Sequence, residues 1–138
     1  MMHPILVFLG GGLGCVSRYL LAIGIARIWP ASPAPAEGGE PLPGVHTGAT
    51  LLVNVLGCVL IGLVWGKLGV GMREETRLLL IVGFLGGFTT FSAIGWESVT
   101  LLNRGHPAHA ALYIALTLVL GLAGVWFGHG LGSRIAAG

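Results

Sequence analysis

The stretch LLLIVGFLGGFTTFSAIGWESVTLL, residues 78–102, is apolar at both ends and carries a cluster of glycines and hydroxyls at its centre. An α-helix needs about 20 predominantly apolar residues to span the hydrocarbon core of a bilayer, so this segment is expected to span a membrane. Glycine weakens helix continuity, and unwound backbone at membrane depth is tolerated only where protein or a water-filled cavity satisfies its polar groups. Residues 83–97 therefore predict a spanning helix that is broken at its middle.

The rest of the chain has the same apolar character. Its 138 residues are 54% hydrophobic and 9% charged, with a mean hydropathy of +0.90, and a soluble domain of this composition would lack polar residues to cover its surface. Further apolar segments cover residues 4–28, 46–67 and 108–132, and a loop rich in Pro, Ala and Gly covers residues 30–44. The predicted fold class is an all-α integral membrane protein, with residues 1–138 forming one domain of four transmembrane helices.

The few charged residues restrict both the partners and the orientation of the chain. A net charge of +2 without a basic face gives no basis for a nucleic-acid partner. Four spanning helices place both termini on one side of the membrane. On that side the segment ends carry Lys67, Arg73, Arg77 and Arg134, and on the other side Arg27 and Arg104. This bias is small for the positive-inside rule, so the sequence permits insertion in both orientations.

Polar side chains also occur at membrane depth in the second and fourth apolar segments. Thr50, Asn54 and Gly57 share one helical face, and Asn54 lies near the expected midplane of the bilayer. The Asn54 amide either donates to a passing anion or bonds across to another helix as a structural contact, and both roles stay open. Tyr113 and Thr117, four residues apart, place two further hydrogen-bond donors on one face.

Two ionisable residues lie inside apolar segments, Arg18 in the first and Glu97 in the third. A membrane-embedded charge normally faces a bundle interior or water, so both residues indicate a polar cavity. Pairing of the two with each other, or with a backbone carbonyl, is the competing interpretation. Cys15 and Cys58 are interpreted as small hydrophobic residues without assigned chemistry.

The predicted break has more than one chemical interpretation. Freed carbonyls suit a cation, whereas half-helix N-termini and hydroxyls suit an anion. The alternative is a glycine-kinked packing helix whose hydroxyls bond back to the preceding turn.

Glycines elsewhere recur at four-residue spacing and predict close helix packing. They are Gly10 with Gly14, and Gly124 with Gly128 and Gly132.

Three motifs follow one another along the chain. They read GGLGCVSRY at residues 11–19, TLLVNVLG at 50–57 and GFLGGFTTFS at 83–92. Together they resemble the Fluc or CrcB family of fluoride channels over nearly the whole chain, and the third motif is highly specific. The resemblance implies passive, fluoride-selective export that relieves fluoride toxicity. It also implies an antiparallel, dual-topology homodimer, surrounded by lipid, in the inner (plasma) membrane of a bacterium.

The resemblance implies roles for particular residues. The implied fluoride pore is lined by Asn54, Phe91, Ser92, Thr50, Thr90, Tyr113, Thr117 and Ile94. The implied vestibule contains Arg18 and Glu97. One structural sodium ion (Na+) is implied at the dimer interface, held by the backbone carbonyls of Gly86 and Thr89.

Position 94 departs from the family pattern. The family usually carries a second pore phenylalanine there, three residues after Phe91, and this chain has Ile94. The positive edge of an aromatic ring can face an anion, whereas an aliphatic side chain has no such quadrupole. The departure leads to the hypothesis that Ile94 makes a slower fluoride pore.

Other function classes fit the residues less well. A small four-helix, dual-topology, proton-coupled cation or drug exporter needs a carboxylate in its first helix, and residues 4–28 contain none. A non-conducting assembly subunit accounts for the glycine faces but gives no reason for polar side chains at membrane depth. An enzyme is least expected, because no carboxylate pair, nucleophile with a base, or metal cluster is recognisable.

Overall fold

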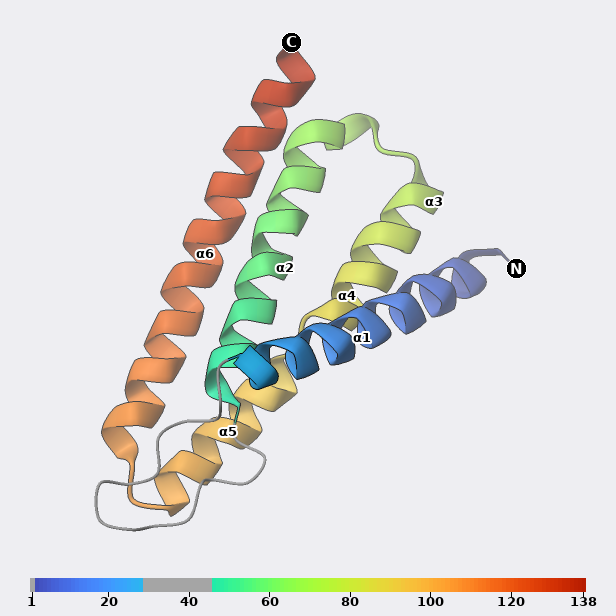
Figure 1. Ribbon diagram of the computed structural model, residues 1–138. Coiled ribbons are helices and arrows are strands. Elements are labelled where there is room, and N and C mark those ends of the chain that lie inside the picture. Colours follow the sequence, from blue (N-terminus) through green and yellow to red (C-terminus); the bar gives the residue numbers. More distant parts are fainter. Residues whose placement is uncertain (1, 29–45) are drawn as a thin grey trace.

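The computed structural model describes residues 2–28 and 46–138, and the predicted loop at 30–44 lies outside them. The described residues are helical almost throughout (Figure 1). The elements are α1 (Met2–Ile28), α2 (Thr47–Leu68), η1 (Gly69–Gly71), α3 (Glu74–Thr76), η2 (Arg77–Leu85), α4 (Gly86–Phe88), α5 (Phe91–Asn103) and α6 (Pro107–Ala137).

Four helical stretches are long and apolar enough to cross a membrane, namely α1, α2, the stretch Glu74–Asn103 and α6. The prediction of an all-α chain with four apolar helices is confirmed. The helices extend further than the predicted spans, because the third stretch begins at Glu74 and α6 continues to Ala137. Helical hydrogen bonding continues into polar flanks where an apolar pattern stops. At the start of the third stretch, Arg77 donates twice to the Glu74 carboxylate, at 2.8 Å each.

Helices α2 and α6 lie side by side along most of their length (Figure 1). Glycines on both helices make this contact close. A Cβ atom at Gly62 or Gly66 of α2 would overlap the α6 backbone, and one at Gly128 or Gly132 of α6 would overlap the α2 backbone. Small residues let helix backbones approach where no hydrophobic force drives helices together in lipid, as the glycine spacing predicted.

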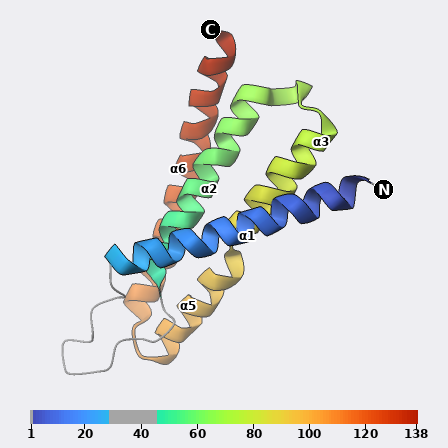
Figure 2. The same cartoon turned by 45° about the vertical axis from the view of Figure 1, so that its right-hand side comes forward.

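Helix α1 crosses the third stretch obliquely (Figure 2). Gly10 and Gly14 are the buried residues of α1. A Cβ atom at Gly14 would overlap the Phe84 carbonyl, and one at Gly10 would overlap the Leu79 carbonyl. The crossing therefore brings α1 directly against the backbone of residues 79–88, which includes the glycines that precede Thr89.

The third stretch leaves helical geometry at two residues. Thr89 has φ −87° and ψ 161°, and Thr90 has φ −151° and ψ 119°, so both are extended. They lie inside residues 83–97, which the sequence singled out. The residues Arg77–Leu85 are π-helical, and the Gly86 N–H donates to the Ile81 carbonyl five residues back. The short helix α4 lies between this π-helix and Thr89. Thr90 then caps α5, because its Oγ1 accepts from Ala93 N at 3.3 Å.

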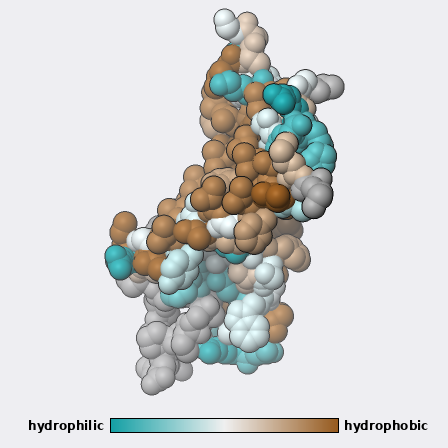
Figure 3. All heavy atoms as spheres, turned by 90° about the vertical axis from the view of Figure 1, so that its right-hand side faces the viewer, coloured by the Kyte–Doolittle hydropathy of each residue, from teal (hydrophilic) through white to brown (hydrophobic). Residues whose placement is uncertain are grey.

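The surface of the single chain is largely apolar. Large side chains such as Phe8 and Trp126 are 78% and 82% exposed. On the face in Figure 3, apolar residues form a broad band across the middle, and hydrophilic residues gather toward the ends. Apolar surface of this extent is typical of a chain that is surrounded by lipid or that packs against a second subunit.

Candidate functional site

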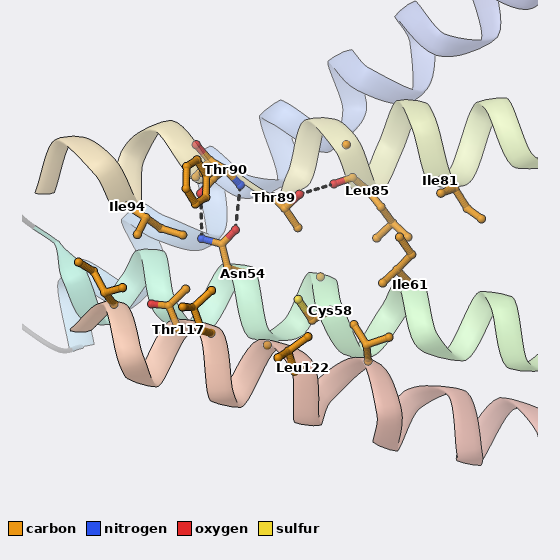
Figure 4. A pocket seen from close by; sticks show the side chains of 17 residues that line it. Asn54, Cys58, Ile61, Ile81, Leu85, Thr89, Thr90, Ile94, Thr117 and Leu122 are labelled. Carbon is orange, nitrogen blue, oxygen red and sulfur yellow. Dashed lines mark hydrogen bonds between the residues drawn. The ribbon is translucent and has the colours of Figure 1, made fainter. Parts of the chain in front are cut away.

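The Asn54 side chain of α2 holds one of the two extended residues. Its Oδ1 accepts from Thr90 N at 2.8 Å, and its Nδ2 donates to Thr90 O at 3.2 Å (Figure 4). The same Nδ2 donates to Thr50 O at 2.9 Å. A carboxamide has two hydrogens, so within the single chain both are engaged by backbone carbonyls.

The Arg18 side chain of α1 holds the other extended residue. Its Nη1 donates to Thr89 O at 3.0 Å. Thr89 N and Thr89 Oγ1 both donate to the Leu85 carbonyl, at 3.0 Å each. The backbone groups of Thr89 and Thr90 are thus all paired within one chain, which membrane depth requires of non-helical backbone.

A second polar cluster surrounds Glu97 on α5, which is only 4% exposed. Oε1 accepts from His46 N at 3.2 Å and from Thr50 Oγ1 at 2.9 Å, and Oε2 accepts from the Tyr113 hydroxyl at 2.6 Å. Three donors thus compensate the desolvation of the carboxylate. Arg18 and Glu97, both among the described residues, form no ion pair with each other.

The remaining hydroxyls bond locally. Thr117 Oγ1 donates to the Tyr113 carbonyl at 2.8 Å, one turn back on α6. Ser92 Oγ and Thr90 Oγ1 lie 3.2 Å apart and share a hydrogen bond. These hydroxyls can rotate without breaking a contact between helices, so they are free to serve a ligand.

A largely apolar hollow of about 570 Å³ opens on one side of Thr89 and Thr90, between the third stretch, α2 and α6 (Figure 4). It contains most of the residues expected in the pore and at the sodium site. These are Asn54, Gly86, Thr89, Thr90, Phe91, Ile94 and Thr117. Phe91 is 81% exposed there, so this hollow has an uncovered aromatic edge.

A second hollow, of about 470 Å³, opens between α1, α2 and α5. It is lined by both residues expected in the vestibule, Arg18 and Glu97, together with Thr50 and Thr90. Thr90 is the one described residue that lines both hollows. The extended residues therefore form the partition between an apolar hollow and a charged one.

Two of the expected pore residues line neither hollow. Tyr113 and Ser92 instead bond to residues that do, Tyr113 to Glu97 and Ser92 to Thr90. The sequence reasoning missed the contribution of His46, whose backbone N–H at the start of α2 reaches Glu97. No residue pattern signals that contact, because a backbone donor carries no sequence identity.

The described residues offer few oxygen atoms that could bind a metal cation. Among residues 2–28 and 46–138, no group of three His, Cys, Asp or Glu side chains is placed to hold a metal ion. The first hollow is lined by Gly86, which precedes the extended segment, and by Thr89, which belongs to it. Thr90 N donates to Asn54 and not to Gly86, which leaves the Gly86 carbonyl suited to a cation, whereas the Thr89 carbonyl is shared with Arg18.

Comparison with known proteins places the chain in a family. The model of the family described as CrcB-like protein, Camphor Resistance (CrcB), matches residues 5–129. A fluoride-specific ion channel FluC of Nitratidesulfovibrio vulgaris (strain DP4) is 42% identical over 137 residues, covering 97% of this chain and 100% of the relative. Another of that name, from Phocaeicola vulgatus, is 40% identical and covers 93% of this chain and 96% of the relative. This multi-pass membrane protein belongs to the CrcB-like family.

Proposed function

We propose that this protein is a passive, fluoride-selective channel that exports fluoride across a bacterial membrane and so relieves fluoride toxicity. The names of its relatives support the proposal. The structural observation that carries it is the row of hydrogen-bond donors beside Thr89 and Thr90, between two hollows. In this proposal Glu74–Asn103 is one transmembrane helix, broken at those two residues.

Fluoride is small and strongly hydrated, so a selective path must replace lost water with donors at each step. The hydroxyls of Thr50, Ser92, Thr117 and Tyr113 supply such donors from three helices when they turn away from their acceptors within the chain. The edge of the Phe91 ring is electropositive because of the ring quadrupole, so it attracts an anion although it carries no hydroxyl. Arg18, on the wall of the second hollow, attracts the anion toward the partition.

The pore is proposed to be completed by a second copy in the opposite orientation. The first hollow is apolar and leaves Phe91 exposed, which suits burial against another subunit more than contact with water. A twofold axis in the membrane plane presents the same face from both subunits. The small charge bias of the chain permits the opposite insertions that this requires.

A structural sodium ion at this interface is part of the proposal. Carbonyl oxygens are hard ligands, and a twofold axis beside Gly86 and Thr89 brings the same two carbonyls from both subunits together. When bound, the ion supplies a positive centre that ties the two broken helices to each other. Arg18 already donates to the Thr89 carbonyl, so that oxygen serves the ion through its second lone pair.

The test is fluoride efflux from liposomes containing the purified protein, with a potassium gradient clamped by valinomycin and a fluoride electrode as the detector. Fast release of fluoride and not chloride, weakened in Phe91→Ala, supports the channel. A matched variant is Trp96→Ala, which removes another exposed aromatic ring from α5 outside both hollows. Release no faster than from protein-free liposomes, by protein shown to be folded, contradicts the proposal.

A further inference from the structure

We infer that Gly57 of α2 is a positioning residue, which leaves a gap for the Thr89 methyl group and thereby fixes the Thr89 carbonyl for the proposed sodium ion. Gly57 is buried, and a Cβ atom there would overlap Thr89 Cγ2. Both residues line the first hollow. The link from this contact to sodium rests on the proposed function, whereas the contact itself does not.

The Thr89 side chain is held in one orientation within the chain. Its Oγ1 donates to the Leu85 carbonyl at 3.0 Å, and the Thr89 backbone N–H donates to the same oxygen at 3.0 Å. With the hydroxyl held there, the methyl group lies against α2, toward which the side chain points (Figure 4). A β-branched side chain is stiff about its first torsion, so the methyl cannot turn away without loss of the hydroxyl bond. The position of the methyl is therefore tied to that of the backbone.

The opposite side of the extended segment is occupied by α1. Arg18 Nη1 donates to the Thr89 carbonyl at 3.0 Å. Two residues before Thr89, a Cβ atom at Gly87 would overlap the Gly11 carbonyl of α1. The segment thus lies between two helices that both approach closely. A methyl group added at Gly57 would push Thr89 where little free space is left, and such additions to a packed interior cause backbone shifts.

A shift of Thr89 changes the proposed sodium site because its carbonyl is one of the expected ligands. The twofold axis of the proposed dimer repeats the shift, so one carbonyl in each subunit would move. Residues that orient metal ligands without touching the metal contribute about 10- to 100-fold to affinity. Gly57 is expected to act in this way, through the Thr89 methyl group.

The test is thermal unfolding of the purified dimer in detergent, without fluoride, over a series of sodium chloride concentrations, with N-methylglucamine chloride keeping the ionic strength constant. A bound ion raises Tm in proportion to its occupancy of the folded state. The wild type is expected to gain stability with sodium, and Gly57→Ala is expected to need about tenfold more sodium for the same gain. Gly48→Ala, on the same helix with nothing within 4 Å of its Cβ position, is the matched control and is expected to respond as the wild type does.

A double variant separates positioning from a general defect in helix packing. Gly57→Ala combined with Thr89→Ser moves one methyl group across the contact, so the total volume is conserved and the hydroxyl that bonds Leu85 is kept. It is expected to fold even where Gly57→Ala alone does not, and to recover most of the sodium response.

Three results would overturn the inference. They are a double variant that responds to sodium no better than a folded Gly57→Ala protein or does not fold, a wild-type response in Gly57→Ala, and a wild-type protein that sodium does not stabilise. Because these measurements involve neither fluoride nor flux, absent fluoride efflux would contradict the proposed channel and leave the sodium result intact.

Discussion

The Tyr113 hydroxyl donates to Glu97 Oε2 at 2.6 Å and joins α6 to α5 in a buried setting. Both residues are almost fully buried, at 5% and 4% exposure. A short hydrogen bond to an ionised carboxylate is among the stronger side-chain contacts. The pair therefore links the wall of the second hollow to the fourth spanning helix.

Tyr113→Phe is expected to lower the stability of the folded protein by about 1–3 kcal/mol, because it leaves one carboxylate oxygen of Glu97 without its donor. Thermal unfolding in detergent measures the change. Tyr19→Phe is the matched control, since Tyr19 is 65% exposed. An equal shift in both variants would contradict a specific role for the Tyr113 bond.

Arg18→Leu is expected to destabilise the fold by about 1.5–3 kcal/mol, the usual contribution of a hydrogen bond to a charged group, and to reduce fluoride flux. The variant removes the donor to the Thr89 carbonyl and the positive charge of the second hollow. Arg27→Leu deletes another arginine of α1, in its last turn, and serves as the control. Unaltered unfolding and flux in Arg18→Leu count against the contact.

Gly14→Ala is expected to cost about 1–3 kcal/mol of stability, because its Cβ would overlap the Phe84 carbonyl where α1 crosses the third stretch. Gly12→Ala lies on the same helix with nothing within 4 Å of its Cβ position, and it should be neutral or slightly stabilising. Chemical or thermal unfolding of both proteins compares them. Equal unfolding of the two variants would contradict the close contact between α1 and the third stretch at Gly14.

Ile94→Phe is expected to raise fluoride flux, because the larger side chain can enter the first hollow and add a ring edge beside Phe91. Initial rates of efflux from liposomes measure the effect at matched protein density. Ile94→Leu changes the shape of the side chain without adding a quadrupole and is the control. An Ile94→Phe channel that conducts no faster refutes the slower-pore hypothesis.

Much of the fold follows from local chemistry. Apolar segments of spanning length can only be helices in lipid, since no water is available to pair their backbone, and the glycines at four-residue spacing meet neighbouring backbones as expected. The ends of the helices were less predictable. Hydrogen bonding between residues such as Arg77 and Glu74 continues the helix beyond the apolar pattern that located it.

The residue types at membrane depth were also readable from sequence, but their pairing was not. Arg18 and Glu97 were candidates to pair with each other or with a backbone carbonyl. Arg18 donates to the Thr89 carbonyl, as the second alternative had it, whereas Glu97 accepts from Thr50, Tyr113 and His46. Which donor reaches which acceptor depends on the angle at which α1 crosses and on the register of α2 against α5. Neither quantity is encoded in the spacing along one helix.

Sequence alone therefore indicated that the chain lies in lipid, how many apolar helices it has and where helix continuity is weak. Each of these depends on composition and on residues that are close together within one segment. Tertiary structure decided the rest. It assigned Asn54 to both backbone groups of Thr90 and divided the polar residues between two hollows. These contacts join residues far apart in the chain, so only the packing of whole helices, set by their close glycine contacts, brings them together.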